Sequence, residues 1–262
     1  MGRRILDTMS GQSDERAAAQ GITRALERRL EGISDVVQRS HLIREYCEVN
    51  EPEIVALSFQ AVIESALKGR SRDTWLAIAI ALFQESVSYR TLEEIYRCCV
   101  EAEHDAARLV LLAGDRARRI AEEGEFSRDD FIENLTLGER KAKARTLEPH
   151  VLLRLLQDPN PTVVRILLNN PRMTERPVQR LAAKRPNRTS ILTEIALVPR
   201  WVCRASIQRA LVLNPYSPAR ITIGLMPLLA AKELNEISQE RNLHPMSQPM
   251  ARTLLRILGW ES

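Results

Sequence analysis

The side chains best suited to bind a partner lie in a basic stretch, residues 172–220. This stretch carries two carboxylates, Glu175 and Glu194, against ten cations. The cations are Arg172, Arg176, Arg180, Lys184, Arg185, Arg188, Arg200, Arg204, Arg209 and Arg220. Clustered cations bind phosphates by releasing counterions, or acidic protein surfaces by charge pairing. The alternatives are a solvated face and arginine stems that cover apolar surface between helices.

Two acidic groups could in principle bind a metal ion or act as paired carboxylates. Glu101 and His104 have the Glu-x-x-His spacing of di-iron bundles, which require a second such motif, and the sequence has none. Asp129, Asp130 and Glu133 are placed to stabilise a helix N-terminus. No P-loop, dinucleotide-binding, zincin or nucleophile-elbow motif occurs. We therefore expect a non-enzymatic protein without metal or cofactor.

The cysteines and the apolar segments indicate where the protein resides. Cys47, Cys98, Cys99 and Cys203 show no C-x-x-C spacing, which favours reduced thiols in a cytoplasmic chain. The N-terminus lacks the apolar core of a secretory signal, and no apolar run approaches the roughly 20 residues of a membrane helix. We expect a cytoplasmic protein that does not contact membranes.

A proline-containing phrase recurs in the C-terminal half. It appears as Asp158–Pro159–Asn160–Pro161 followed by Val163–Val164–Arg165, and again as Val198–Pro199 followed by Val202–Cys203–Arg204. The first copy continues to Asn170–Pro171 and the second to Asn214–Pro215. The offset between the copies, about 40 residues, is typical of stacked helical repeats, in which each unit buries its apolar face against the next.

The helix pattern divides the chain near residue 147. Of 13 prolines only Pro52 precedes Pro149. We expect residues 1–14 to be disordered, residues 15–146 to form an α-helical region with or without degenerate repeats, and residues 147–262 to form the repeats. In the first region the predicted helices are 15–31, 34–49, 52–68, 73–86, 91–103, 105–122 and 127–145, with capping boxes at Thr91–Glu94 and Thr136–Glu139.

The repeats are predicted to consist of three helices each. The first unit comprises 162–169, 175–184 and 188–197, and the second comprises 200–212, 218–229 and 231–241. Their third helices match, since Leu192–Thr193–Glu194–Ile195–Ala196 corresponds to Leu234–Asn235–Glu236–Ile237–Ser238. Half-units precede and follow them.

At these residues the sequence resembles HEAT and armadillo repeat proteins, and also bacterial leucine-rich-repeat-variant proteins. The Asp-Pro-x-x-x-Val-Arg turn of HEAT-like units is matched by Asp158, Pro159, Val163 or Val164, and Arg165, with the arginine one position late. The resemblance implies an all-α, right-handed solenoid that binds other macromolecules, and it carries no catalytic residues. Nothing in the N-terminal half matches the iron–sulfur cysteine cluster of leucine-rich-repeat-variant proteins.

The resemblance also implies which side chains face a partner. The third helices of armadillo-type units line a concave groove, where Arg154, Thr193 and Asn235 occupy equivalent positions, and an asparagine there can hold a peptide backbone. Trp201 is either a core aromatic or a ring that stacks on a base. We expect the partner to contact Arg154, Arg176, Arg180, Lys184, Arg185, Arg188, Thr193, Trp201, Arg204 and Asn235.

The charges of the two halves favour a scaffold or adaptor. Residues 148–262 carry 16 Lys and Arg against 8 Asp and Glu, and the preceding residues carry 22 against 26. An acidic or extended segment of a protein is therefore the expected partner. A nucleic acid bound by the basic stretch is the alternative. A third interpretation is that the basic and acidic halves pack together, within one chain or between two, which leaves the oligomeric state open.

Overall fold

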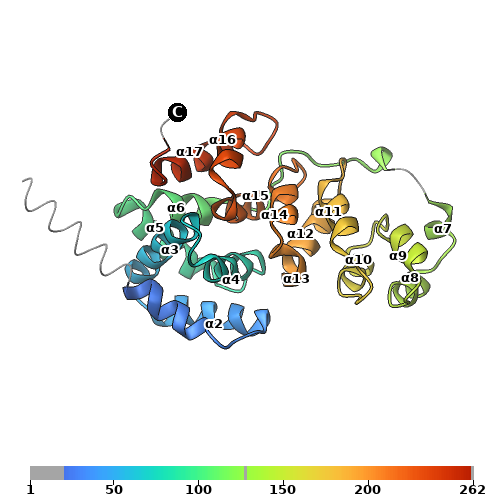
Figure 1. Ribbon diagram of the computed structural model, residues 1–262, viewed down its shortest axis with the longest axis horizontal. Helices are drawn as coiled ribbons and strands as arrows, with labels where there is room; N and C mark the ends of the chain where they lie inside the picture. The colour runs from blue at the N-terminus through green and yellow to red at the C-terminus, as the bar shows by residue number, and fades with distance from the viewer. Residues whose placement is uncertain (1–20, 127–128, 261–262) are drawn as a thin grey trace, which may run out of the picture. The chain divides into compact units, whose positions relative to one another are not determined.

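The computed structural model describes residues 21–126 and 129–260, and there the regular elements are helices (Figure 1). The all-α prediction is therefore confirmed for this part of the chain. The chain forms two compact units. The first contains the described residues up to Leu112 together with Arg256–Trp260, and the second contains Ala113–Leu255. The predicted disorder of residues 1–14 lies outside the described residues.

Unit 1 is built around two central helices, those of residues 52–67 and 72–83. Its elements are the helix of residues 21–30, α2 (Val36–Val49), α3 (Pro52–Leu67), α4 (Arg72–Phe83), α5 (Tyr89–Glu101) and α6 (Asp105–Leu112). Helix α3 packs against α4, α5 and α6, and α2 packs against α4. Because α4 is apolar almost all round, Trp75, Ile78 and Ile80 are all buried.

Unit 2 contains short helices. They are η1 (Glu123–Glu125), α7 (Asp130–Glu133), α8 (Leu137–Lys143), α9 (Pro149–Leu155), α10 (Pro161–Leu168), α11 (Glu175–Ala183), α12 (Thr189–Leu197), α13 (Pro199–Val202), α14 (Ala205–Val212), α15 (Ala219–Leu225), η2 (Met226–Leu228), α16 (Ala231–Gln239) and the start of α17 (Ser247–Ile257). Helix α10 packs against α8 and α12, and α11 packs against α14. Unit 2 thus joins helices separated in the chain by one or two others, in addition to neighbours such as α12 and α13 or α14 and α15.

Several predicted helices were wrong in extent. The predicted helix 105–122 ends at Leu112, after which the chain is extended. The predicted helix 127–145 is divided into α7 and α8, and the predicted helix 200–212 into α13 and α14. Residues 218–229 form α15 and η2, since Pro227 interrupts the α-helix.

The two predicted capping boxes had different outcomes. Thr136 and Glu139 form the predicted box at the start of α8. Thr91 does not cap α5, because the helix begins two residues earlier, at Tyr89. Its cap is Ser88, whose hydroxyl accepts a hydrogen bond from the Thr91 amide at 3.2 Å.

The recurring Asn-Pro phrase places a buried asparagine against the end of an earlier helix. The Asn170 side-chain amide donates to the carbonyl oxygens of Ala144 at 2.9 Å and Thr146 at 2.8 Å, just past α8. Its oxygen accepts from the Arg172 amide at 2.9 Å. The last carbonyls of a helix lack partners within the helix, so this side chain satisfies two groups that water cannot reach easily.

Asn214 repeats the same arrangement in the second copy. Its amide donates to the carbonyl oxygens of Ala182 at 2.7 Å and Lys184 at 3.0 Å, at the end of α11, and its oxygen accepts from the Tyr216 amide at 3.1 Å. The Asn170 and Asn214 residues are 4% and 1% exposed. The sequence phrase thus corresponds to one physical device, an asparagine that joins each turn to an earlier helix.

We expect Asn170→Ala to lower the free energy of unfolding by about 2 to 4 kcal/mol, because it leaves two carbonyls and one amide without partners. Urea unfolding followed by circular dichroism measures the loss. The matched control is Asn169→Ala, since the exposed Asn169 side chain makes a single bond, to the Arg165 carbonyl. That variant should lose no more than about 0.5 kcal/mol. Equal losses in the two variants would contradict the assigned role.

Candidate functional site, an arginine ladder that holds an extended strap

A segment of unit 2, residues 113–126, is extended up to Glu122 and ends in the short helix η1. We call it the strap, and Figure 1 shows it as a green trace that runs from the region of α15 towards α7. Its first part pairs with the turn between α14 and α15. The Arg119 amide donates to the Pro215 carbonyl at 2.9 Å, and the Arg220 amide donates to the Gly114 carbonyl at 2.9 Å.

The pairing is an isolated antiparallel bridge. Ala117 faces Pro218, and the Ala219 amide donates to the Arg116 carbonyl at 3.2 Å. Main-chain groups of a turn between two helices therefore bind an extended chain, as the edge of a sheet does when it accepts a peptide strand.

Three arginines hold carboxylates of the strap and of the residues just after it. Arg220 lies 2.6 Å from Asp115 in an ion pair. Arg188 donates two hydrogen bonds to Glu123, at 2.5 and 2.8 Å. Arg154 donates to Asp129 at 2.5 Å. We call Arg154, Arg188 and Arg220 the arginine ladder.

The ladder has a direction. Along the strap the carboxylates follow the order Asp115, Glu123, Asp129, while their arginine partners follow the order 220, 188, 154. The order of the carboxylates along the chain is therefore the reverse of the order of the arginines that bind them.

Two rungs of the ladder also contact an aromatic ring. The Arg188 guanidinium lies 4.2 Å from the centre of the Phe126 ring, and the Arg154 guanidinium lies 4.5 Å from that of Phe131. A guanidinium can bind a carboxylate at its edge while its face rests on a ring, which lysine cannot do. Each of these rungs therefore recognises an acid together with an aromatic residue.

The ladder changes the acidity of the carboxylates that it holds. Hydrogen bonding to Arg188 lowers the pKa of Glu123, and hydrogen bonding to Arg154 lowers the pKa of Asp129. The Glu123 side chain is 81% exposed. Ion pairs so exposed to water are weak and are screened by salt.

Most cations of the basic stretch bind other parts of unit 2. Lys184 donates to Gln157, and Arg185 donates to the Leu213 carbonyl. Arg200 donates to the carbonyls of Asn170 and Met173. Two further arginines form ion pairs. Arg204 lies 4.0 Å from Glu175, and Arg209 pairs with Glu233 and Glu236.

A row of three arginines is left over. The side chains of Arg172, Arg176 and Arg180, at and along α11, are exposed and have no partner among the residues that the structure describes. The expected partner contacts include two of these three, Arg176 and Arg180, and that expectation remains a prediction.

Trp201 belongs to the core. It is 3% exposed, and its indole nitrogen donates to the Leu168 carbonyl at 2.7 Å. The Arg200 guanidinium covers its ring at 4.4 Å. The core interpretation of this residue therefore agrees with the structure, and stacking on a base would require the ring to leave its place.

Two of the predicted groove residues make hydrogen bonds within their own helices. Thr193 donates to the Thr189 carbonyl of its own helix, and the Asn235 carbonyl accepts from Ser238. Within the described part of the chain, no hydrogen bond or ion pair joins either residue to Arg154. The acids that follow Thr193 and Asn235 in the sequence join helices. Glu194 accepts two hydrogen bonds from Arg165, and Glu236 accepts one from Arg209.

The acidic groups and cysteines form no reactive constellation. Asp129 caps α7 by accepting from the Phe131 amide at 2.9 Å, as predicted. Among the described residues, no cluster of three or more potential ligands could hold a metal ion. Cys47 and Cys99 are buried, which raises the pKa of each thiol to about 12. In the same residues, none of the helices has the length and apolar character to cross a membrane.

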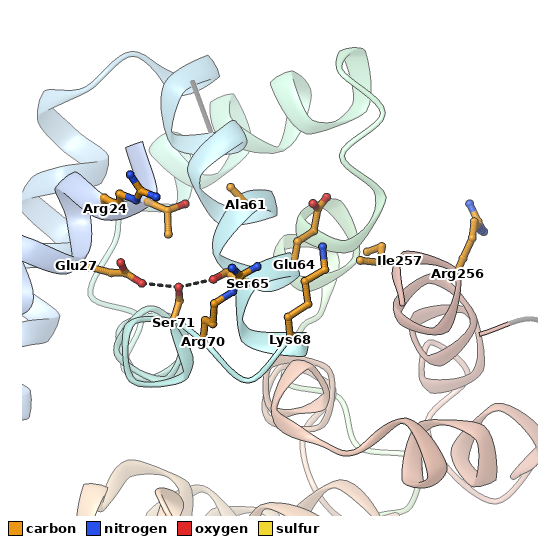
Figure 2. Close-up of a pocket in the computed structure, with 11 residues that line it drawn as sticks. Arg24, Glu27, Ala61, Glu64, Ser65, Lys68, Arg70, Ser71, Arg256 and Ile257 are labelled. Carbon is orange, nitrogen blue, oxygen red and sulfur yellow. Dashed lines mark hydrogen bonds between the residues drawn. The ribbon is translucent and has the colours of Figure 1, made fainter. Parts of the chain in front are cut away.

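Unit 1 contains an open polar pocket of about 710 Å³ (Figure 2). Figure 2 shows Ser71 between Glu27 and Ser65, and its hydroxyl is hydrogen-bonded to both. Lys68 and Arg70 also line the pocket. Its walls mix acids and cations, and the contact between a hydroxyl and a carboxylate in them is that of Ser71 with Glu27.

Comparisons of this chain with protein-family models, with curated proteins and with solved structures gave no match.

The sequence did not reveal the strap, although it contains a signal for it. Arg116, Arg118 and Arg119 are followed by Glu122, Glu123 and Glu125, and glycines stand at 114 and 124. Two of the four phenylalanines of the chain, Phe126 and Phe131, follow directly. Glycines at both ends of a charged run argue against one continuous helix.

We expect Arg188→Ala to expose the strap to trypsin, because the substitution removes both the ion pair with Glu123 and the contact with Phe126. Cleavage after Arg116, Arg118 and Arg119 should become several-fold faster, as followed by mass spectrometry under native conditions. Arg180→Ala is the control, since it removes an exposed arginine that contacts nothing described. If both variants are cut at the wild-type rate, Arg188 does not hold the strap.

The lowered pKa values predict that acid releases Glu123 of the strap from Arg188, and Asp129 from Arg154. A carboxylate whose pKa is lowered by its partner contributes stability above its unfolded pKa, and this stability is lost as the pH falls through the lowered value. Carbon-13 NMR titration should place the midpoint of Glu123 below 4.5 and that of Asp129 below 3.8, their ordinary values.

Crossed variants test which arginine causes each shift. Arg188→Ala should raise the midpoint of Glu123 alone, and Arg154→Ala should raise that of Asp129 alone. If either variant moved both midpoints equally, the shifts would arise from the general field of the protein.

Proposed function

We propose that this protein is a non-enzymatic scaffold or adaptor that binds a protein partner through unit 2. On this proposal unit 2 is a short helical-repeat array of the HEAT or armadillo kind. Two recurring contacts support that interpretation. Asn170 and Asn214 play the same part in successive turns, and the pairs Arg165–Glu194 and Arg209–Glu236 join equivalent helices.

The observation that carries the proposal is the strap itself. Unit 2 already binds an extended stretch of polypeptide, using main-chain hydrogen bonds at the α14–α15 turn and the arginine ladder along its side. Main-chain pairing combined with spaced side-chain contacts is how proteins recognise extended peptides. A surface that binds one such segment has the chemistry to bind another.

The basic stretch supports a protein partner better than a nucleic acid. Seven of its ten cations donate to or pair with groups of the protein, which leaves Arg172, Arg176 and Arg180. Sequence-independent binding of DNA or RNA draws its affinity from many phosphate contacts, each made by a free cation. Nucleic-acid binding along α11 is nevertheless the second candidate, because these three arginines are exposed.

The two candidates differ in what the full chain retains. When the full-length protein is used as bait in an extract of its native cell, we expect it to retain a partner protein in stoichiometric amount. Chemical crosslinks to that partner should map to residues 113–255. The triple variant Arg172→Glu, Arg176→Glu and Arg180→Glu should leave that capture intact. A labelled oligonucleotide that binds at low salt, is released steeply by salt and is lost in the triple variant would favour the nucleic-acid function. Recovery of no stoichiometric protein would overturn the scaffold.

A further inference from the structure

We infer that the arginine ladder recognises a segment of a partner protein in which a carboxylate precedes an aromatic residue by two or three positions, and that the strap, with Asp129 and Phe131 after it, occupies this site until such a segment displaces it. This inference rests on the proposed function and names the chemistry of the partner.

The spacing between the carboxylate and the aromatic residue comes from the two rungs in which one arginine contacts both groups. Arg188 contacts Glu123 and Phe126, three positions apart, and Arg154 contacts Asp129 and Phe131, two positions apart. In each rung the guanidinium edge meets the acid and its face meets the ring. A segment that carried acid alone would satisfy half of each rung.

The direction of the partner segment follows from the strap. The α14–α15 turn supplies a donor at Arg220 and an acceptor at Pro215, and both bind main-chain groups without regard to side-chain type. A partner that uses them must run from α15 towards α9, as the strap does, so that its acids reach Arg220, Arg188 and Arg154 in that order.

The strap is held in a way that allows its displacement. Most of its residues after Ala117 are exposed, including Ile120 at 79%. Because it buries little apolar surface, its attachment depends on main-chain bonds and on ion pairs that water screens. Because the strap is part of the same chain and lies between α6 and α7, it acts as a tethered competitor, at an effective concentration of order millimolar.

The experiment measures binding of a fluorescein-labelled synthetic peptide with the sequence of residues 113–126 to the full-length protein, by fluorescence anisotropy. In the double variant Glu123→Ala and Phe126→Ala the strap no longer engages Arg188. We expect that variant to bind the peptide at least about tenfold more tightly than the wild type, whose ladder is occupied. Glu123→Gln, which keeps the size of the side chain, should shift affinity in the same direction by less.

Two controls show whether the ladder is the binding surface. When added to the double variant Glu123→Ala and Phe126→Ala, Arg188→Ala should weaken peptide binding about tenfold, whereas Arg180→Ala should not change it. A second peptide with alanine at the positions of Glu123 and Phe126 should bind at least tenfold more weakly than the first. Circular dichroism and the Tm establish that each variant is folded.

Three results of this experiment would overturn the inference. They are equal peptide affinity of the wild type and the double variant, peptide affinity that Arg188→Ala does not change, or equal binding of the two peptides. These results do not depend on a cellular partner. If they occur while the full chain still captures a stoichiometric protein, the scaffold function stands and its surface lies elsewhere. If the peptide binds as expected but no protein is captured, the ladder binds only the strap, and both the scaffold function and the inferred partner segment are overturned.

Discussion

The structure of unit 2 depends on how the ends of its short helices are satisfied. A helix of seven to nine residues leaves about half of its carbonyls without a partner inside the helix. Asn170 and Asn214 meet this demand from a later turn, where each is buried and donates to two carbonyls. Because the asparagine oxygen also binds its own turn, one side chain fixes both the end of an early helix and the path of a later loop.

That constraint positions the candidate site. The turn that pairs with the strap begins at Asn214, and residues 214–219 are all buried, so the main-chain groups offered to Gly114, Arg116 and Arg119 are held in place. Arg188 directly follows Asn187, whose buried side chain donates to the Leu181 carbonyl. Fixed helix ends thus present the ladder, while the strap that it binds stays exposed. A rigid surface with a weakly held occupant is suited to exchange one segment for another.

The sequence predicted the helices of this protein well where local signals agree with tertiary contacts. Thr136 and Glu139 mark a helix start, and the apolar run around Ile78 marks a buried helix. It failed at residues 113–122, which are rich in good helix formers but pair instead with a turn about a hundred residues later. Long-range main-chain pairing cannot be read from the local sequence, in which Gly114 and Gly124 argue only against one continuous helix. For the same reason the ladder could not be recognised, since Arg154 lies within α9 while Arg188 and Arg220 stand near helix starts.

The formal charge of the C-terminal half also misled, because charge in a sequence is not potential at a surface. The basic stretch was a single feature in the sequence, yet the structure divides it into cations that join helices, two rungs of the ladder and the exposed row on α11. Arg188, Arg204, Arg209 and Arg220 each have a carboxylate beside them, which cancels most of their field in solvent. Arg188 and Arg220 take their carboxylates from the strap. Displacement of the strap would therefore remove two negative charges and raise the positive potential around both arginines. The attraction of this surface for acidic segments therefore depends on whether the strap is bound.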